Sequence, residues 1–150
     1  MSETVIRMAC ADDAEAVAAI ERATSDTPWS ITALAKDISD NSRAIVLVAS
    51  VNGDVIGYAD VWCIAGEAEL NNIGVLEGYR GRHIGQALLE EAIRKSSASC
   101  QLMNLEVRAG NNAAISLYEK LGFVRNGLRK NYYENNGEDA VLMTAEIGNV

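Results

Sequence analysis

One loop decides the fold of this chain: it reads VLEGYRGRHIG, from Val75 to Gly85. It follows a predicted strand and leads into a predicted helix, whose first N–H groups have no partner within the helix and carry the positive end of its dipole. Gly81 and Gly85 let a ligand come close to the backbone. Arg80 and Arg82 add positive charge, so the loop predicts a pyrophosphate site. The alternative is a glycine-rich turn with solvated arginines.

The strands before this loop are predicted to form an antiparallel sheet. They cover residues 43–51, 55–64 and 69–75, and Asn52-Gly53 between the first two is a strong signal for a type I′ hairpin turn. A dinucleotide-binding loop would instead follow the first strand of a parallel unit and read G-x-G-x-x-G, which is absent. The antiparallel order therefore disfavours a dinucleotide as the ligand.

Helices and strands also alternate on both sides of this region. Before it, we predict a strand over residues 4–9, a helix that begins at Asp12-Asp13 and a second helix after the N-cap Ser30. After it, we predict helices over residues 84–97 and 112–121, and strands over 102–108, from Phe123 onward and over 140–147. This order indicates a mixed α/β fold. With 150 residues and no repeat or linker, we expect a single domain over residues 1–150.

Composition and charge narrow the class of protein. Hydrophobic residues make up 49% of the chain and charged residues 23%, which is typical of a globular domain. The chain has 13 basic and 21 acidic residues and a net charge of −8, which disfavours nucleic acid as a partner. The charge suits a basic peptide, although solubility alone also explains it. Because no long apolar run or signal-like segment occurs, we expect a cytoplasmic protein without membrane contact.

The sequence does not predict a metal site. Cys10, Cys63 and Cys100 lie far apart and form no C-x-x-C pair, and His83 is the only histidine. A structural zinc site is therefore not expected, and neither is Ser-His-Asp or Cys-His catalysis. We expect the three cysteines to be small buried side chains.

The loop from Val75 to Gly85 resembles the acetyl-CoA loop of the GNAT acetyltransferases, whose usual pattern is V-x-P-x-Y-R-G-x-G-I-G. The resemblance implies a central, mostly antiparallel, twisted sheet of about six to seven strands flanked by about four helices. It also implies that the loop amides hold the pyrophosphate of acetyl-CoA and that the preceding strand pairs with the pantetheine arm. The implied cofactor-binding residues are Ile73, Gly74, Val75, Arg80, Gly81, Arg82, His83, Ile84, Gly85 and Gln86.

Two positions depart from the GNAT pattern. Glu77 replaces the proline, and His83 replaces the first motif glycine, where a side chain hinders the closest backbone approach. One hypothesis is that cationic His83 contacts a phosphate; the alternative is an exposed imidazole without a contact. Titration of acetyl-CoA into His83→Ala and His83→Gly distinguishes the two, because a ring without a role leaves binding unchanged.

A second informative segment reads LEVRAGNNAAISLYEKLGF, from Leu105 to Phe123. Alternation along its strand puts Glu106 on the face opposite the apolar residues. A half-buried carboxylate is costly unless it is solvated or paired, so a surface pair with Arg108 is one interpretation. Tyr118 lies on the apolar stripe of the following helix, where an ordinary core tyrosine would also lie.

Acetyl transfer from a thioester to an amine would give both side chains a function. The reaction must first remove a proton from an ammonium, and a carboxylate can do so, directly or through water, for an α-amine with a pKa of about 8. The leaving thiolate then needs a proton, which a phenol can supply. No covalent intermediate is required if the two substrates are held together.

The second segment also resembles the RimI type of GNAT enzyme, the ribosomal-protein-alanine N-acetyltransferases. It matches L-E-V-R-x-x-N-x-x-A-x-x-L-Y-x-x-L-G-F, and the similarity extends from about Ile6 to Met143. The resemblance implies that Glu106 is the general base, that Tyr118 is the general acid and that Asn111 contacts the cofactor. It implies acetyl transfer from acetyl-CoA to the N-terminal alanine of a small-subunit ribosomal protein.

Three aromatic residues are candidates for the groove that binds this peptide: Trp29, Tyr132 and Tyr133. Packing at the edge of the core is the alternative for each of them. Other acceptors also stay open, namely a lysine side chain, a polyamine or a small-molecule amine, as does a CoA-sensing module without turnover. The sequence leaves the oligomeric state open, with a monomer favoured.

Overall fold

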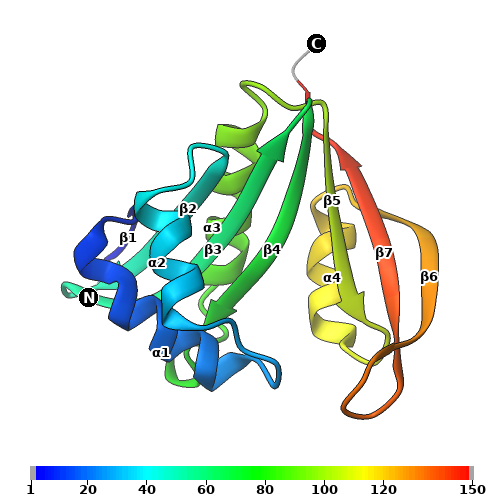
Figure 1. The fold of residues 1–150 in the computed structure, drawn as a ribbon, viewed down its shortest axis with the longest axis horizontal. Helices are drawn as coiled ribbons and strands as arrows, with labels where there is room; N and C mark the ends of the chain where they lie inside the picture. The colour runs from blue at the N-terminus through cyan, green and yellow to red at the C-terminus, as the bar shows by residue number, and fades with distance from the viewer. Residues whose placement is uncertain (1–2, 149–150) are drawn as a thin grey trace.

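A computed structural model describes residues 3–148. Within these residues, seven strands form one twisted sheet with four α-helices packed on it (Figure 1). The strands are β1 (Thr4–Met8), β2 (Ala44–Val51), β3 (Asp54–Ile64), β4 (Glu67–Val75), β5 (Leu102–Arg108), β6 (Val124–Tyr133) and β7 (Glu138–Glu146). The helices are α1 (Ala14–Thr24), α2 (Ile31–Ser39), α3 (Ile84–Ser96) and α4 (Asn112–Lys120), with short 3-10 turns at Ala11–Asp13 and Glu77–Tyr79. The predicted order of elements and the mixed, mostly antiparallel fold class are confirmed.

The order of strands in the sheet is β1-β2-β3-β4-β5-β7-β6. All neighbouring pairs of described strands are antiparallel except β4 and β5, which run parallel because α3 crosses over between them. This parallel pairing is short: it joins Glu67–Leu70 to Leu102–Leu105, and the two strands then separate (Figure 1).

A bulge in β4 accounts for the separation. The register with β3 shifts between Asp60 and Val61, so that Asn71 is an extra residue on the β4 side. A bulge bends its strand and increases the local twist. From Asn71 onward, β4 therefore diverges from β5 and leaves a gap in the sheet between the two strands.

Buried apolar side chains cover both faces of the central strands. Strand β2 shows this most clearly, since Val46 and Val48 pack with α1 and α2, whereas Leu47 and Ala49 belong to the core that includes α3. Figure 1 accordingly places α1 and α2 in front of the sheet and α3 behind it. A strand buried on both faces reads as a continuous apolar run, which explains the sequence of residues 44–51.

The expectation for the cysteines was only partly correct. Cys100 is buried, but Cys63 is half-buried and Cys10 is exposed. Cys10 lies between the edge strand β1 and the 3-10 turn that precedes α1. All three are free thiols. Within residues 3–148, no three His, Cys, Asp or Glu side chains are grouped as a metal site would require. None of the helices described there is long and apolar enough to cross a membrane.

Candidate active site

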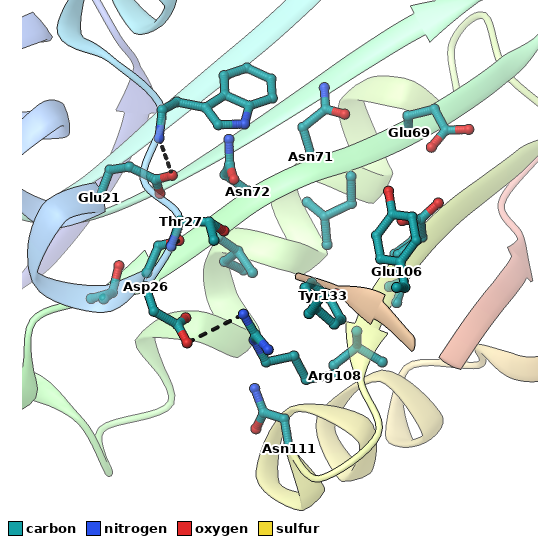
Figure 2. Close-up of a pocket in the computed structure, with 18 of the residues that line it drawn as sticks. Glu21, Asp26, Thr27, Glu69, Asn71, Asn72, Glu106, Arg108, Asn111 and Tyr133 are labelled. Atoms are coloured by element: carbon teal, nitrogen blue, oxygen red, sulfur yellow. Dashed lines mark hydrogen bonds and ion pairs between the residues drawn. The ribbon is translucent and has the colours of Figure 1, made fainter. Parts of the chain in front are cut away.

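A pocket of about 840 Å³ opens where β4 and β5 separate (Figure 2). Its walls come from these two strands, the loop between α1 and α2, the start and inner face of α4, and the end of β6. The pocket brings together seven of the residues singled out in the sequence: Trp29, Ile73, Glu106, Asn111, Tyr118, Tyr132 and Tyr133. Residues from position 29 to position 133 of the chain therefore share one cavity.

Glu106 faces the pocket because β5 alternates as predicted, with its apolar residues buried on the other side. Its carboxylate lies 3.4 Å from Nε of Arg129, and a third of the side chain is exposed. The anticipated pair with Arg108 is not formed among the described ion pairs. Burial, together with the negative charge of Glu106, raises the pKa of Glu69 on the adjacent strand. Glu106 and Glu69 thus place two carboxylates on adjacent strands of the pocket, with the Arg129 guanidinium beside Glu106, an arrangement that favours a cationic ligand.

Tyr118 reaches the pocket from α4. It is 7% exposed, and its ring packs against Phe123 at a centroid distance of 5.8 Å. In the described part of the chain, no residue accepts a hydrogen bond from its hydroxyl. Burial raises the pKa of Tyr118 to about 12. The hydroxyl is therefore protonated at neutral pH and can act as a donor.

Arg108 joins the α1–α2 loop to the ends of β6 and β7 at the mouth of the pocket. Its guanidinium lies 3.3 Å from Asp26 in the α1–α2 loop and stacks on the ring of Tyr133 at 3.9 Å (Figure 2). It also lies 3.2 Å from Glu138 at the start of β7. The other oxygen of Glu138 accepts from the backbone N–H of Gly110, at 2.7 Å. Sequence reasoning treated Arg108 only as a partner of Glu106. Its place on the same strand face was the available signal for a role at the site.

Glu21 holds the α1–α2 loop in place, and sequence reasoning did not identify it. Its buried carboxylate accepts a hydrogen bond from the hydroxyl of Tyr58, at 2.6 Å, and another from the backbone N–H of Trp29, at 3.0 Å. Burial and this carboxylate raise the pKa of Tyr58. Trp29 therefore enters the pocket wall on a loop that is anchored to β3.

The predicted pyrophosphate loop lies outside the lining of this pocket. It leads from the free end of β4 to the start of α3, and Arg80, Gly81, Arg82 and His83 are all exposed. Nε of Arg80 donates to the carbonyl oxygen of Val75, at 3.1 Å. At the other end of the loop, Ile84 is buried, Gly85 packs near Leu117, and Gln86 accepts a hydrogen bond from Lys120 at 3.0 Å.

The backbone conformation of this loop explains why the GNAT pattern has a glycine at the position that His83 occupies in this chain. His83, the N-cap of α3, has φ +60°, and Gly81 has φ +80°. Both values lie in the left-handed region that glycine adopts without strain. Gly74 has a different reason: a Cβ there would lie 2.6 Å from the hydroxyl of Thr24, so the glycine lets α1 pack onto β4.

Several features fit acetyl-CoA. Beyond Leu70, β4 pairs with no strand on the β5 side within residues 3–148, which leaves its polar backbone groups free along the gap. The side-chain amide nitrogens of Asn71 and Asn72 are buried there without a hydrogen-bond partner in the described structure. The exposed loop N–H groups at the start of α3 and two arginines suit a pyrophosphate.

Comparison with known proteins agrees with this site. The model of the acetyltransferase (GNAT) domain family matches residues 42–125. A ribosomal protein bS18-alanine N-acetyltransferase from Haemophilus influenzae is 34% identical over 148 residues, which cover 96% of this chain and 99% of that protein. The ribosomal-protein-S18-alanine N-acetyltransferase structure from Escherichia coli has a TM-score of 0.90 and 33% identity, covering 99% of this chain and 96% of that one. NAA60 from Arabidopsis thaliana, solved with acetyl-CoA, shares the fold at TM-score 0.87 and 20% identity, covering 97% and 99%.

The fold, the gap between β4 and β5 and the loop before α3 define an acyltransferase of the GNAT family, and the chain belongs to that family. Within the family, it is an acetyltransferase of the RimI type, the type of the Haemophilus and Escherichia relatives.

Proposed function

We propose that the chain transfers the acetyl group of acetyl-CoA directly to the N-terminal α-amine of a protein, namely the N-terminal alanine of ribosomal protein bS18. The observation that carries the proposal is that Glu106 and Tyr118 line one pocket at the gap between β4 and β5. A carboxylate that could accept a proton and a phenol that could donate one thus line the same pocket, beside the strand edge that suits a pantetheine arm. The choice of acceptor follows the Haemophilus and Escherichia relatives, which are N-acetyltransferases of the alanine of this ribosomal protein.

Acetyl-CoA would be held at two places. The N–H groups between Gly81 and Gly85 and the charge of Arg82 would bind the pyrophosphate. Asn111 caps α4 by accepting a hydrogen bond from the N–H of Ala114 at 3.2 Å, which leaves its amide nitrogen free to donate to the cofactor. When bound, the cofactor supplies the activated thioester.

Glu106 would accept the proton of the acceptor ammonium, directly or through one water molecule. Arg129 forms an ion pair with this carboxylate at 3.4 Å, while Glu69 on the adjacent strand adds negative potential that attracts the cationic amine. An α-amine with a pKa of about 8 requires only this modest base near neutral pH. The pocket chemistry therefore suits an N-terminus better than a lysine side chain, whose pKa is above about 10.

Tyr118 would supply the proton to the leaving thiolate. Its pKa of about 12 exceeds that of a thiol, about 8.5. The proton therefore moves only as negative charge builds on sulfur, and before that the hydroxyl stabilises the charge as a hydrogen-bond donor. Neither residue forms a covalent bond with the acetyl group.

A thiol-release assay with short peptides tests the proposal. We expect release with a peptide that begins with alanine, and none when the same peptide carries an acetylated N-terminus and an internal lysine. Release with the blocked peptide would assign the activity to the lysine side chain. Binding of acetyl-CoA without release on any amine would make the chain a sensor rather than an enzyme.

A further inference from the structure

A second cavity adjoins the pocket and has no role in the chemistry above. It is an open groove of about 540 Å³ between α2 and the end of β3, and its lining is Trp29, Ala33, Lys36, Asp37, Asn41 and Trp62. Trp29 lines both cavities, so the two share a wall. We propose that this Trp29–Trp62 groove is a subsite for the acceptor peptide, which takes a large apolar or aromatic side chain at about the fourth residue. The inference rests on the proposed function.

The groove is preformed by hydrogen bonds beneath it. Nε1 of Trp62 donates to the carboxylate of Asp37 at 2.7 Å, and the amide of Asn41 donates to the other oxygen at 3.0 Å. Burial alone would raise the pKa of Asp37, but hydrogen bonds from its neighbours outweigh that effect and lower it. Asp37 is therefore ionised and buried, and both of its oxygens accept hydrogen bonds from protein groups. These contacts fix the plane of the Trp62 indole.

The two indoles present apolar surface to the groove. Their ring centroids lie 5.9 Å apart with an interplanar angle of 57°, and both side chains are half-buried. Tilted aromatic faces of this kind favour contact with a further ring or a branched aliphatic chain. Lys36 is the exposed charged residue of the lining, at the side of α2.

The sheet register places the groove on the path of the peptide. Trp62 in β3 pairs with Glu69 in β4, and Glu69 pairs with Asn104 in β5, two residues before Glu106. Two strand spacings and two residues along a strand separate Glu106 from Trp62 by roughly 12 Å. An extended peptide advances about 3.4 Å per residue, so its fourth residue reaches the groove when its amine lies at Glu106.

The direction of the peptide follows from the position of the cofactor. The pyrophosphate loop continues from Val75, whereas Trp62 lies beside Glu69, toward the opposite end of β4. A peptide whose amine meets the acetyl group therefore extends away from the cofactor, past Glu69 and along Trp29. This continuity favours the acceptor peptide over a second copy of the chain as the occupant.

Intrinsic fluorescence tests the proposal without turnover, because Trp29 and Trp62 are the two tryptophans of the chain. The probes are hexapeptides that begin with alanine, lack Tyr and Trp, and carry either Phe or Ser at the fourth residue. The Phe peptide is expected to change the emission with saturation, and to bind about tenfold more tightly than the Ser peptide, as contacts in a hydrophobic pocket do. Equal affinities would overturn the proposal. The proposal would also be overturned if the emission changed with protein concentration and no peptide altered that change. This result would mean that a second copy of the chain occupies the groove.

Turnover supplies the second measurement. The wild type should prefer the Phe peptide by about tenfold in kcat/KM, mainly through KM. Trp62→Ala should abolish this preference, so that both peptides have the same kcat/KM. Ala33→Leu should have the same effect, because it fills the groove but keeps the hydrogen bond between Trp62 and Asp37. Val124→Ala, which removes an exposed apolar side chain from the far strand β6, should keep the ratio. A ratio that survives in the first two variants would contradict the subsite. If the wild type acetylates neither peptide, the proposed function fails and the fluorescence titration still decides the subsite.

Discussion

Replacement of Tyr118 by Phe separates the packing of this side chain from its proposed proton transfer. The ring stays against Phe123, and only the hydroxyl is lost. Because no described residue accepts a hydrogen bond from that hydroxyl, its removal leaves no buried partner unsatisfied. We therefore expect the free energy of unfolding to change by less than about 0.5 kcal/mol.

The expected effect of the same change on turnover is large. General acid catalysis contributes roughly 10²- to 10⁴-fold, so kcat should fall by at least about 100-fold. The pKa of Tyr118, raised to about 12, keeps the hydroxyl protonated throughout the range of a practical assay. The loss should therefore be nearly constant from about pH 6 to pH 9.

Thiol release at saturating acetyl-CoA and peptide measures kcat, and urea unfolding measures stability. Tyr58→Phe is the matched control, since it deletes the hydroxyl that hydrogen-bonds buried Glu21. That variant should lose about 1.5–3 kcal/mol of stability, because a buried carboxylate loses its donor. A kcat of Tyr118→Phe within threefold of the wild type, with chemistry limiting the rate, would refute the proposed acid.

Three further changes test other parts of the structure. Glu106→Gln should bind acetyl-CoA with unchanged affinity in calorimetry. Its turnover should fall most steeply below about pH 8, where the acceptor amine is charged. A loss of affinity for acetyl-CoA as large as the loss of turnover would contradict the assignment of Glu106 as the base. His83→Gly should raise the unfolding free energy in urea by up to about 1 kcal/mol, because His83 has φ +60°, and His83→Ala should gain nothing. Burial and the neighbouring Asp37 raise the pKa of Asp60 to about 9. The folded state thus keeps a proton that the unfolded state releases above about pH 4, so stability should fall as pH rises from 4 toward 9. Asp60→Asn should flatten that slope in pH-dependent urea unfolding, and an unchanged slope would show that Asp60 is not its source.

The sequence by itself determined the elements and part of the site. Turn signals such as Asn52-Gly53 and the alternation of apolar residues are local properties, so the strands and helices were predicted in the right order. The same alternation put Glu106 on the polar face of its strand, where the pocket opens. The roles of Glu106 and Tyr118 stay predictions.

Only the tertiary structure decided how these pieces meet. The bulge at Asn71 separates β4 from β5 and creates the pocket, and a bulge depends on the register between two strands. Arg108 meets Asp26, and Trp29 meets Trp62, across dozens of intervening residues. Contacts of this kind arise from the order of strands in space, which local periodicity along a single chain does not encode.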